Sequence, residues 1–494
     1  MSHKQNHSEL VNKILHGARW ATVLRLAAQV FSWLGTIIVV RFISPEDYGL
    51  NTMLESPLVL LMLLSTLGLD GALVQAKNIK PEELQSIFGW LLILNGILFL
   101  CYFFGGAVLA SYFHEPRLDL LAKALAFIFL LVPFRVIPNA LLDRQLDFKL
   151  RAQLEIVATV VAAITVLVLA YSGAGVWALV SGVIVSKLLL SILLMIFKPW
   201  FIVPKFNFAV IRRIASIGGI MALGSVFTIL SDQLVSLIAG PKLGTALLGV
   251  FAIGAQFASL PLTKGMPILN QTMLPAFSKL QDHRVSATYY LEKLLGVASL
   301  AFFPMMIGMA CVADTLVLTV FGAKWAASIW PLAIMSLGMI FRMNNLLLKT
   351  VMTSMGRADL SLISNFIQLA LLLPMIIYAV DYGVAGVVTA WVATELLLTL
   401  AIMQMSKSVI DTTFIQYLRC YRPALLSSFI MGGSVIGIKL LFGYQSGMVV
   451  FLMVIATGML SYYLATRFLF LKELQTALKT VFGERLAFLA PHRS

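Results

Sequence analysis

Long apolar runs separated by short polar stretches dominate the pattern of this chain. One helical crossing of a bilayer needs about 20 apolar residues, so the pattern predicts about fourteen membrane-spanning helices. The predicted spans are 19–40, 48–68, 86–110, 118–142, 154–171, 174–197, 214–239, 245–272, 291–320, 329–351, 360–380, 384–405, 421–442 and 447–470. The eighth and ninth runs exceed one bilayer thickness, so we expect these helices to tilt, break or extend beyond the membrane.

The composition indicates a surface that faces lipid. Hydrophobic residues make up 60% of the 494 residues and charged residues 12%, whereas soluble domains carry about 25% charged residues. We therefore expect an all-α integral membrane protein without a sizeable soluble domain. The connecting segments are too short for a nucleotide-binding fold, and the sequence lacks the G-x-x-x-x-G-K-[ST] motif, which argues against direct hydrolysis of ATP.

The first apolar run, the cysteines and the histidines further limit the class of protein. The first apolar run follows some 18 mostly polar residues, and no small-residue cleavage site comes after it, so we expect this run to be a retained span. Cys101, Cys311 and Cys420 lie far apart, and the six histidines never pair at ligand spacing. Neither a disulfide framework, a metal site nor a cofactor is expected.

The distribution of lysine and arginine predicts the orientation. With the N-terminus inside, 25 of the 36 Lys and Arg fall in inside segments, 6 in outside segments and 5 within spans. This bias predicts that both termini are cytoplasmic and that the number of spans is even. The formal charge of +14 is spread singly over the loops, so nucleic acid is not an expected partner.

The two halves of the chain show a weak repeat. Ala174-Gly175-Val176 before the sixth span recurs as Ala385-Gly386-Val387 before the twelfth. A six-plus-six arrangement is typical of transporters whose substrate site lies between the halves. The predicted domains are a cytoplasmic tail (1–18), an N-lobe of helices 1–6 (19–200), a C-lobe of helices 7–12 (201–410), helices 13–14 (411–470) and a basic cytoplasmic tail (471–494).

Polar side chains recur along one face of the first predicted span. Thr22, Arg25, Gln29, Ser32 and Thr36 follow one another at steps of three and four, which places them on one side of a helix. A stripe of this length favours a water-filled lumen, with hydrogen bonding between helices as the alternative.

Other spans also carry charges, which cost about 2.5–3.5 kcal/mol at mid-bilayer and therefore normally face a cavity or a partner. The predicted substrate-binding residues of a cationic lumen are Arg19, Arg25, Gln29, Gln256, Lys264, Arg342 and Lys349, and the candidates for ion coupling or ion pairing are Glu55, Asp232 and Glu395.

Structural roles stay open for several of these residues. Asp232 and Lys264 could form an ion pair between adjacent helices. Lys187 and Glu395 fit either a lumen or structural pairing, and Arg135 and Lys349 could snorkel toward the inner membrane surface.

The balance of charge within the spans predicts the cargo. The spans contain more cations than carboxylates. The five cations are Arg25, Lys187, Lys264, Arg342 and Lys349, and the three carboxylates are Glu55, Asp232 and Glu395. A net cationic cavity prefers an anionic substrate, and a guanidinium group binds phosphate in a bidentate manner without losing its proton. We therefore predict a phosphate-bearing cargo.

Five segments in order along the chain carry a resemblance to a known family. They are Arg41-Phe-Ile-Ser-Pro-Glu-Asp-Tyr-Gly49, Gly68-Leu-Asp-Gly-Ala-Leu-Val-Gln75, Asp143-Arg-Gln-Leu-Asp-Phe-Lys149, Leu274-Pro-Ala-Phe-Ser-Lys-Leu-Gln281 and Phe321-Gly-Ala-Lys-Trp325. With them the chain resembles the polysaccharide-transporter (Wzx-type) flippases of the multidrug/oligosaccharidyl-lipid/polysaccharide exporter superfamily, in particular the branch of colanic-acid and related exopolysaccharide exporters.

The resemblance implies two pseudo-symmetric six-helix lobes around a central cavity, followed by two C-terminal helices. It implies translocation of undecaprenyl-pyrophosphate-linked oligosaccharides across the bacterial inner membrane by a monomer. Related lipid II flippases carry lumen arginines on the first helix and a cation on the eighth, where this chain has Arg19, Arg25 and Lys264. The expected partners are the lipid-linked oligosaccharide, membrane lipids, and polysaccharide polymerase and assembly proteins.

Three other functions remain as alternatives. An ion-coupled drug or cation antiporter of the same fold would export cationic dyes and depend on acidic residues alone. A polytopic polysaccharide polymerase or ligase would usually carry a sizeable external loop with catalytic Arg or His, whereas the largest outside loop here, near 111–117, is short. A scaffold without transport activity does not explain the polar stripe.

Overall fold

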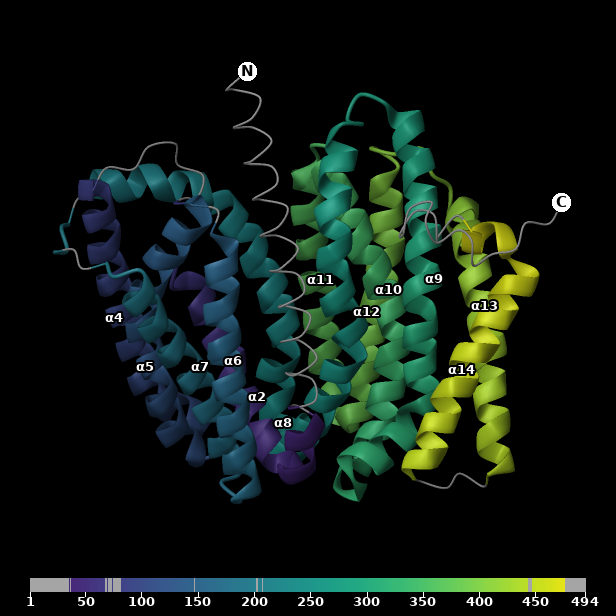
Figure 1. The fold of residues 1–494 in the computed structure, drawn as a ribbon, viewed down its shortest axis with the longest axis horizontal. Coiled ribbons are helices and arrows are strands. Elements are labelled where there is room, and N and C mark those ends of the chain that lie inside the picture. Colours follow the sequence, from purple (N-terminus) through teal and green to yellow (C-terminus); the bar gives the residue numbers. More distant parts are fainter. Residues whose placement is uncertain are drawn as a thin grey trace. The chain divides into compact units, whose positions relative to one another are not determined.

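The computed structural model describes residues 35, 37–66, 69, 73, 81–145, 147–200, 203–206, 208–442 and 447–475, without the side chains of 208–225 and of residue 272. Within these residues every regular element is a helix (Figure 1). The first predicted span, 19–40, lies almost wholly outside them. The chain divides into two compact units, Met1–Ala246 and Leu247–Ser494, called here the N-terminal and C-terminal units.

The described part of the N-terminal unit contains five complete helices and the first part of a sixth. They are α2 (Pro45–Leu64), α4 (Pro81–Tyr112), α5 (Arg117–Arg144), α6 (Phe148–Tyr171), α7 (Val176–Phe197) and the beginning of α8 (Phe208–Ser278). Each of the complete helices coincides, within a few residues, with one predicted span. Within this unit α4 packs along α5 and α6 along α7.

Local sequence signals explain where these helices begin. Ser44 caps α2 by accepting a hydrogen bond from the backbone N–H of Asp47, and Pro45 occupies the first turn. Asp147 caps α6 through the backbone N–H of Leu150. α4 begins at Pro81, and Glu82 and Glu83 give it an acidic first turn, which interacts favourably with the positive end of the helix dipole.

Apolar packing and two polar contacts hold the N-terminal unit together. A core cluster joins the end of α2 to α4 and α5 around Ile87, Leu91 and Val136. Across the same region Asn95 donates to the Ser65 carbonyl at 3.0 Å, and Tyr102 donates to the Leu54 carbonyl at 2.9 Å. These two donors tie α4 to α2 through hydrogen bonds to backbone carbonyls inside the bundle.

The described part of the C-terminal unit contains the second part of α8 and six further α-helices. They are α9 (Arg284–Leu316), α10 (Ile329–Ser354), α11 (Ala358–Ala379), α12 (Gly383–Ser406), α13 (Phe414–Leu441) and α14 (Met448–Leu469). A π-helical turn (Val317–Phe321) and a 3-10 helix (Ala323–Ser328) join α9 to α10. α9 packs on α13, α13 lies beside α14, and α12 packs on both α10 and α11 (Figure 1).

A break in the helical backbone interrupts α8 at Gly244. This residue has φ 74° and ψ 176°, a conformation that favours glycine. It separates the predicted spans 214–239 and 245–272, which otherwise follow one another without a loop. Pro261, Gly265 and Pro267 do not interrupt the second part of α8, which continues through them with helical backbone angles.

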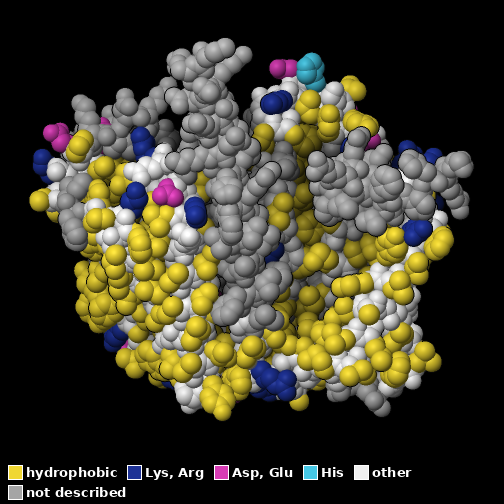
Figure 2. Space-filling model, viewed as in Figure 1, with side chains coloured by type: hydrophobic (Ala, Val, Ile, Leu, Met, Phe, Trp, Pro, Cys, Tyr) yellow, Lys and Arg dark blue, Asp and Glu magenta, His cyan; other side chains and the backbone are white. Residues whose placement is uncertain are grey.

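The surface of the helices matches a lipid environment. Large apolar side chains such as Phe104, Val108 and Phe429 are 69%, 69% and 65% exposed. On the face drawn in Figure 2, hydrophobic side chains cover the sides of the helices, and most charged side chains lie near helix ends. Ten stretches of the described chain are long and apolar enough to cross a membrane, so the chain is a multi-pass membrane protein.

Ion pairs neutralise several cations that the sequence places outside. Arg117 pairs with Glu115 at 2.8 Å, and Lys123 pairs with Asp119 at 2.7 Å. Lys439 on α13 is 3% exposed and contacts both Asp314 and the Cys311 carbonyl of α9. The last contact joins α13 firmly to α9.

We expect Gly386→Ala to lower the free energy of unfolding by about 1–3 kcal/mol, the range for overpacked buried sites. A Cβ atom at Gly386 would lie 2.0 Å from the Ala379 carbonyl oxygen, which belongs to the backbone and has little room to move. Gly437→Ala is the control, because nothing lies within 4 Å of its Cβ position. Unfolding in detergent micelles measures both, and equal stability of the two variants would contradict the expectation.

Candidate functional site

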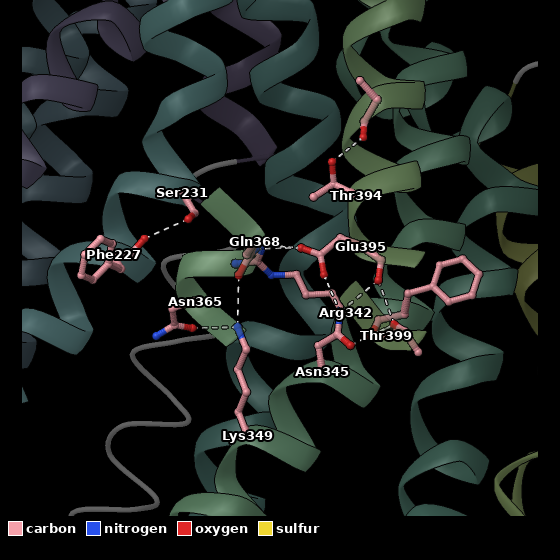
Figure 3. A network of polar contacts seen from close by, with 12 residues as sticks. Phe227, Ser231, Arg342, Asn345, Lys349, Asn365, Gln368, Thr394, Glu395 and Thr399 are labelled. Atoms are coloured by element: carbon pink, nitrogen blue, oxygen red, sulfur yellow. Dashed lines mark hydrogen bonds and ion pairs between the residues drawn. The ribbon is translucent and has the colours of Figure 1, made fainter. Parts of the chain in front are cut away.

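A buried polar network joins three helices of the C-terminal unit. Its members are Arg342, Asn345 and Lys349 on α10, Asn365 and Gln368 on α11, and Glu395 and Thr399 on α12. Figure 3 shows these side chains pointing toward one another from the three helices. We call this group the Glu395 cluster.

The carboxylate of Glu395 lies at the centre of the cluster and is 1% exposed as a residue. It accepts hydrogen bonds from Arg342 Nη1 at 3.1 Å, Asn345 Nδ2 at 2.9 Å and Gln368 Nε2 at 3.2 Å. The Arg342 guanidinium also lies 5.9 Å from the centre of the Trp391 ring. A buried carboxylate requires such partners, because an isolated charge in a low-dielectric interior is strongly unfavourable.

Lys349 extends the cluster toward α11. Its ammonium group donates to Asn365 Oδ1 at 2.8 Å and to Gln368 Oε1 at 3.1 Å. Gln368 therefore connects the lysine to Glu395, since its amide oxygen faces Lys349 and its amide nitrogen faces the carboxylate. Two cations and one carboxylate give the cluster a net charge of +1.

The sequence pattern explains why α10 supplies three members. Arg342, Asn345 and Lys349 follow one another at steps of three and four, so they share one face of the helix. Their partners Asn365, Gln368 and Thr399 were not predicted from the sequence. Their spacing does indicate shared helix faces, because Asn365 and Gln368 are three residues apart and Thr399 follows Glu395 by four. Uncharged polar side chains are, however, common in membrane helices and do not by themselves predict a site.

The other predicted site residues lie elsewhere. Gln256 and Lys264 are exposed on α8 within the C-terminal unit. Glu55 on α2 and Asp232 on α8 are exposed within the N-terminal unit. Arg19, Arg25 and Gln29 lie outside the described residues. Of the predicted set, the structure therefore brings together Arg342, Lys349 and Glu395, and in this group Glu395 takes the ion-paired role.

An apolar groove of about 470 Å³ lies in the same unit. Side chains from α8, α9, α13 and α14 line it, including four methionines, Met305, Met309, Met431 and Met459. Methionine adapts its shape to irregular apolar partners. The groove can therefore accommodate a flexible hydrocarbon chain.

The described residues contain no group of three or more His, Cys, Asp or Glu that could hold a metal ion. Neither the Glu395 cluster nor the groove pairs a nucleophile with a base. Their chemistry is that of binding: charge and amide groups in the cluster, and apolar contact in the groove.

Comparison with known proteins shows the family. A family model described as "Polysaccharide biosynthesis protein" matches residues 38–330, more than half of the chain. The lipopolysaccharide biosynthesis protein WzxC of Escherichia coli (strain K12) is 24% identical over 424 residues, which cover 85% of this chain and 86% of WzxC. The teichuronic acid biosynthesis protein TuaB of Bacillus subtilis (strain 168) is 22% identical over 362 residues, which cover 71% of this chain and 73% of TuaB.

A solved structure shows the same fold. A lipid II flippase MurJ in an inward closed conformation aligns with a TM-score of 0.71 at 15% identity and covers 92% of this chain and 99% of its own. The fourteen spans and their arrangement in two lobes remain predictions. The comparisons confirm the prediction of a membrane transporter rather than an enzyme. The chain is thus a multi-pass membrane protein that belongs to the polysaccharide biosynthesis protein family.

Proposed function

We propose that this protein is a flippase that moves undecaprenyl-pyrophosphate-linked oligosaccharide repeat units across the bacterial inner membrane for exopolysaccharide, capsule or O-antigen synthesis. One observation carries the proposal: the C-terminal unit combines an excess of cations within its membrane helices with an apolar groove. A substrate with an anionic head and a hydrocarbon tail needs both features.

The cations provide the sites for the head group. Lys264, Arg342 and Lys349 outnumber Glu395 in the C-terminal unit, and Arg19 and Arg25 add to them in the first predicted span. Guanidinium and ammonium groups form charge-assisted hydrogen bonds with pyrophosphate oxygens. Gln256 and Gln29 add neutral donors and acceptors for sugar hydroxyls.

The apolar groove provides a place for part of the polyprenyl tail. The lipid then stays in an apolar environment while the sugar–pyrophosphate head passes through the polar interior. The lobes open alternately to the two sides, as in other transporters built from repeats. This mechanism needs only one chain, so we expect the protein to work as a monomer.

The membrane potential favours outward movement of an anionic head. When the membrane potential is negative on the cytoplasmic side, moving one negative charge outward is favourable by about 2.3 kcal/mol per 100 mV. Glu55 and Asp232, which are exposed in the N-terminal unit, are candidates for coupling to an ion gradient that resets the empty carrier. Both termini lie in the cytoplasm, where polymerase and assembly proteins can reach the basic C-terminal tail.

Transport into proteoliposomes tests the proposal. We expect the wild-type protein to translocate a fluorescent pyrophosphate-linked oligosaccharide lipid. Arg25→Ala and Lys264→Ala should each slow this transport by about 10–100-fold, because a hydrogen bond to a charged group contributes about 1.5–3 kcal/mol. Lys123→Ala, which removes an outer ion pair with Asp119, should transport normally.

Two outcomes would oppose the proposal. Normal transport by both Arg25→Ala and Lys264→Ala would remove the role of the cationic residues. Failure of the wild type to move the lipid, together with efflux of a cationic dye, would favour the ion-coupled drug or cation antiporter.

A further inference from the structure

A polar pocket of about 580 Å³ lies within the N-terminal unit, in the range of about 300–1,000 Å³ found for small-molecule sites. Its charged lining residues are Arg135 and Asp143 on α5, Arg151 and Glu155 on α6, and Lys187 on α7. We call it the α5–α7 pocket. It shares no residue with the Glu395 cluster or the apolar groove.

One arginine contacts both carboxylates of the pocket. Arg151 Nη1 lies 2.5 Å from Asp143 Oδ2, and Arg151 Nε lies 2.9 Å from Glu155 Oε1. Lys187 is a further cation of the lining, and Arg151 rather than Lys187 forms the ion pairs with the two carboxylates. The pocket therefore keeps a cation that can attract one negative charge.

Lys187 is the cation best placed to receive that charge. Its side chain is partly buried, and Arg135 and Glu155 are its charged neighbours. Within the described residues, neither the Lys187 ammonium group nor the neighbouring Ser186 hydroxyl has a hydrogen-bond partner. A partly buried ammonium group gains most from a partner that is both negative and able to accept hydrogen bonds.

The pocket also offers an unused acceptor. Asn139 Oδ1 is buried and has no hydrogen-bond partner within the described residues, and Asn139 lines the pocket. The carboxylates of Asp143 and Glu155 have further lone pairs beyond those that contact Arg151. A simple anion cannot donate hydrogen bonds to the oxygens of Asn139, Asp143 and Glu155. A ligand with hydroxyl groups can, because a hydroxyl group both donates and accepts.

These complementary groups define the ligand. We propose that the α5–α7 pocket binds a sugar unit that carries one anionic group, a carboxylate or a phosphate. The anionic group contacts Lys187, and ring hydroxyls donate to Asn139 and the paired carboxylates. The inference rests on the proposed function and adds a sugar-selective subsite to it, in the N-terminal unit alone.

Equilibrium binding to the purified full chain in detergent micelles tests this assignment. The probes are glucuronate, glucose 1-phosphate, glucose and glycerol 3-phosphate, measured by titration calorimetry. We expect one of the two anionic sugars to bind more tightly than glucose by about tenfold or more, and the tighter one identifies the anionic group. Lys187→Met should weaken its binding about 10–100-fold and leave glucose unchanged.

Two further variants separate the role of charge from that of folding. Lys187→Arg retains the charge and should keep most of the affinity. Ser186→Ala changes no charge and should weaken binding about twofold to tenfold, so it provides a test even if Lys187→Met does not fold. Lys123→Met, at a cation of α5 paired outside the pocket, should bind as the wild type does.

The inference would be overturned if neither anionic sugar bound, or if the folded Lys187→Met variant bound them as tightly as the wild type. If glucose 1-phosphate is the tighter anionic sugar, equal binding of glycerol 3-phosphate would also overturn it, since the sugar ring would then contribute nothing. These failures differ from failure of the proposed function, because translocation of the lipid-linked substrate in proteoliposomes is measured independently of soluble sugar binding.

Discussion

Replacing Glu395 with alanine is expected to lower the free energy of unfolding by about 3–5 kcal/mol, as is usual when one partner of a buried ion pair is removed. The change would remove the carboxylate that accepts hydrogen bonds from the Arg342 guanidinium and from the Asn345 and Gln368 amides. Denaturant titration in mixed micelles, followed by the loss of helical circular dichroism, measures the effect.

A double-mutant cycle isolates the charge pair from its surroundings. Arg342→Met combined with Glu395→Leu should be less destabilised than the sum of the two single variants, because the double variant leaves neither member of this pair without its partner. Glu395→Gln keeps the hydrogen-bonding shape and should lie between the wild type and Glu395→Ala. Additive effects in the cycle would mean that the contact between Arg342 and Glu395 contributes no coupling energy.

Filling the apolar groove is expected to slow transport of a long-chain polyprenyl substrate by about tenfold or more. Gly308 lines the groove, and a Cβ atom there would meet only the flexible end of Met431, at 3.4 Å. Gly308→Phe therefore adds a ring that occupies the groove with little disturbance of the backbone. A tenfold change in affinity corresponds to about 1.4 kcal/mol. Burial of about two or three methylene groups of the tail in the groove supplies that much free energy.

Chain length and a matched glycine provide the controls for this prediction. A substrate with a short tail should be transported nearly as well by Gly308→Phe as by the wild type. Gly433→Phe introduces the same side chain at an exposed position of α13 with nothing within 4 Å, and it should not affect transport. Equal slowing of the short and long substrates by Gly308→Phe would argue against a role of the groove in binding the tail.

The helices were predictable because a lipid-facing helix is recognisable by its length and hydrophobicity. The predicted span 86–110 became α4 (Pro81–Tyr112), and the predicted span 329–351 became α10 (Ile329–Ser354). The structural helices extend beyond the apolar runs because polar residues at either end still continue the backbone hydrogen bonds. The break at Gly244 was not predicted, since one glycine among many gives no sign that its φ angle will be positive.

The pairing of charges was less predictable than their presence. The 3,4 spacing of Arg342, Asn345 and Lys349 indicated a shared face, but nothing in the sequence shows which helix meets that face. The pairing with Glu395 depends on how α10 packs on α12. Likewise, nothing in the sequence shows that Arg151 on α6 and Lys187 on α7 line one pocket.

The ion pairs of the predicted outer side bear on how the chain is assembled in the membrane. Arg117, Lys123 and Lys439 must cross the bilayer during insertion if both termini stay inside, and each has an acidic neighbour: Glu115, Asp119 and Asp314. Glu115 and Asp119 are close in sequence to their partners and so cross with them as neutral pairs. Asp314 belongs to α9, which is synthesised long before α13, so the site that receives Lys439 is already in place when that lysine arrives. The order of synthesis thus provides Arg117, Lys123 and Lys439 with their counter-ions before or as they cross.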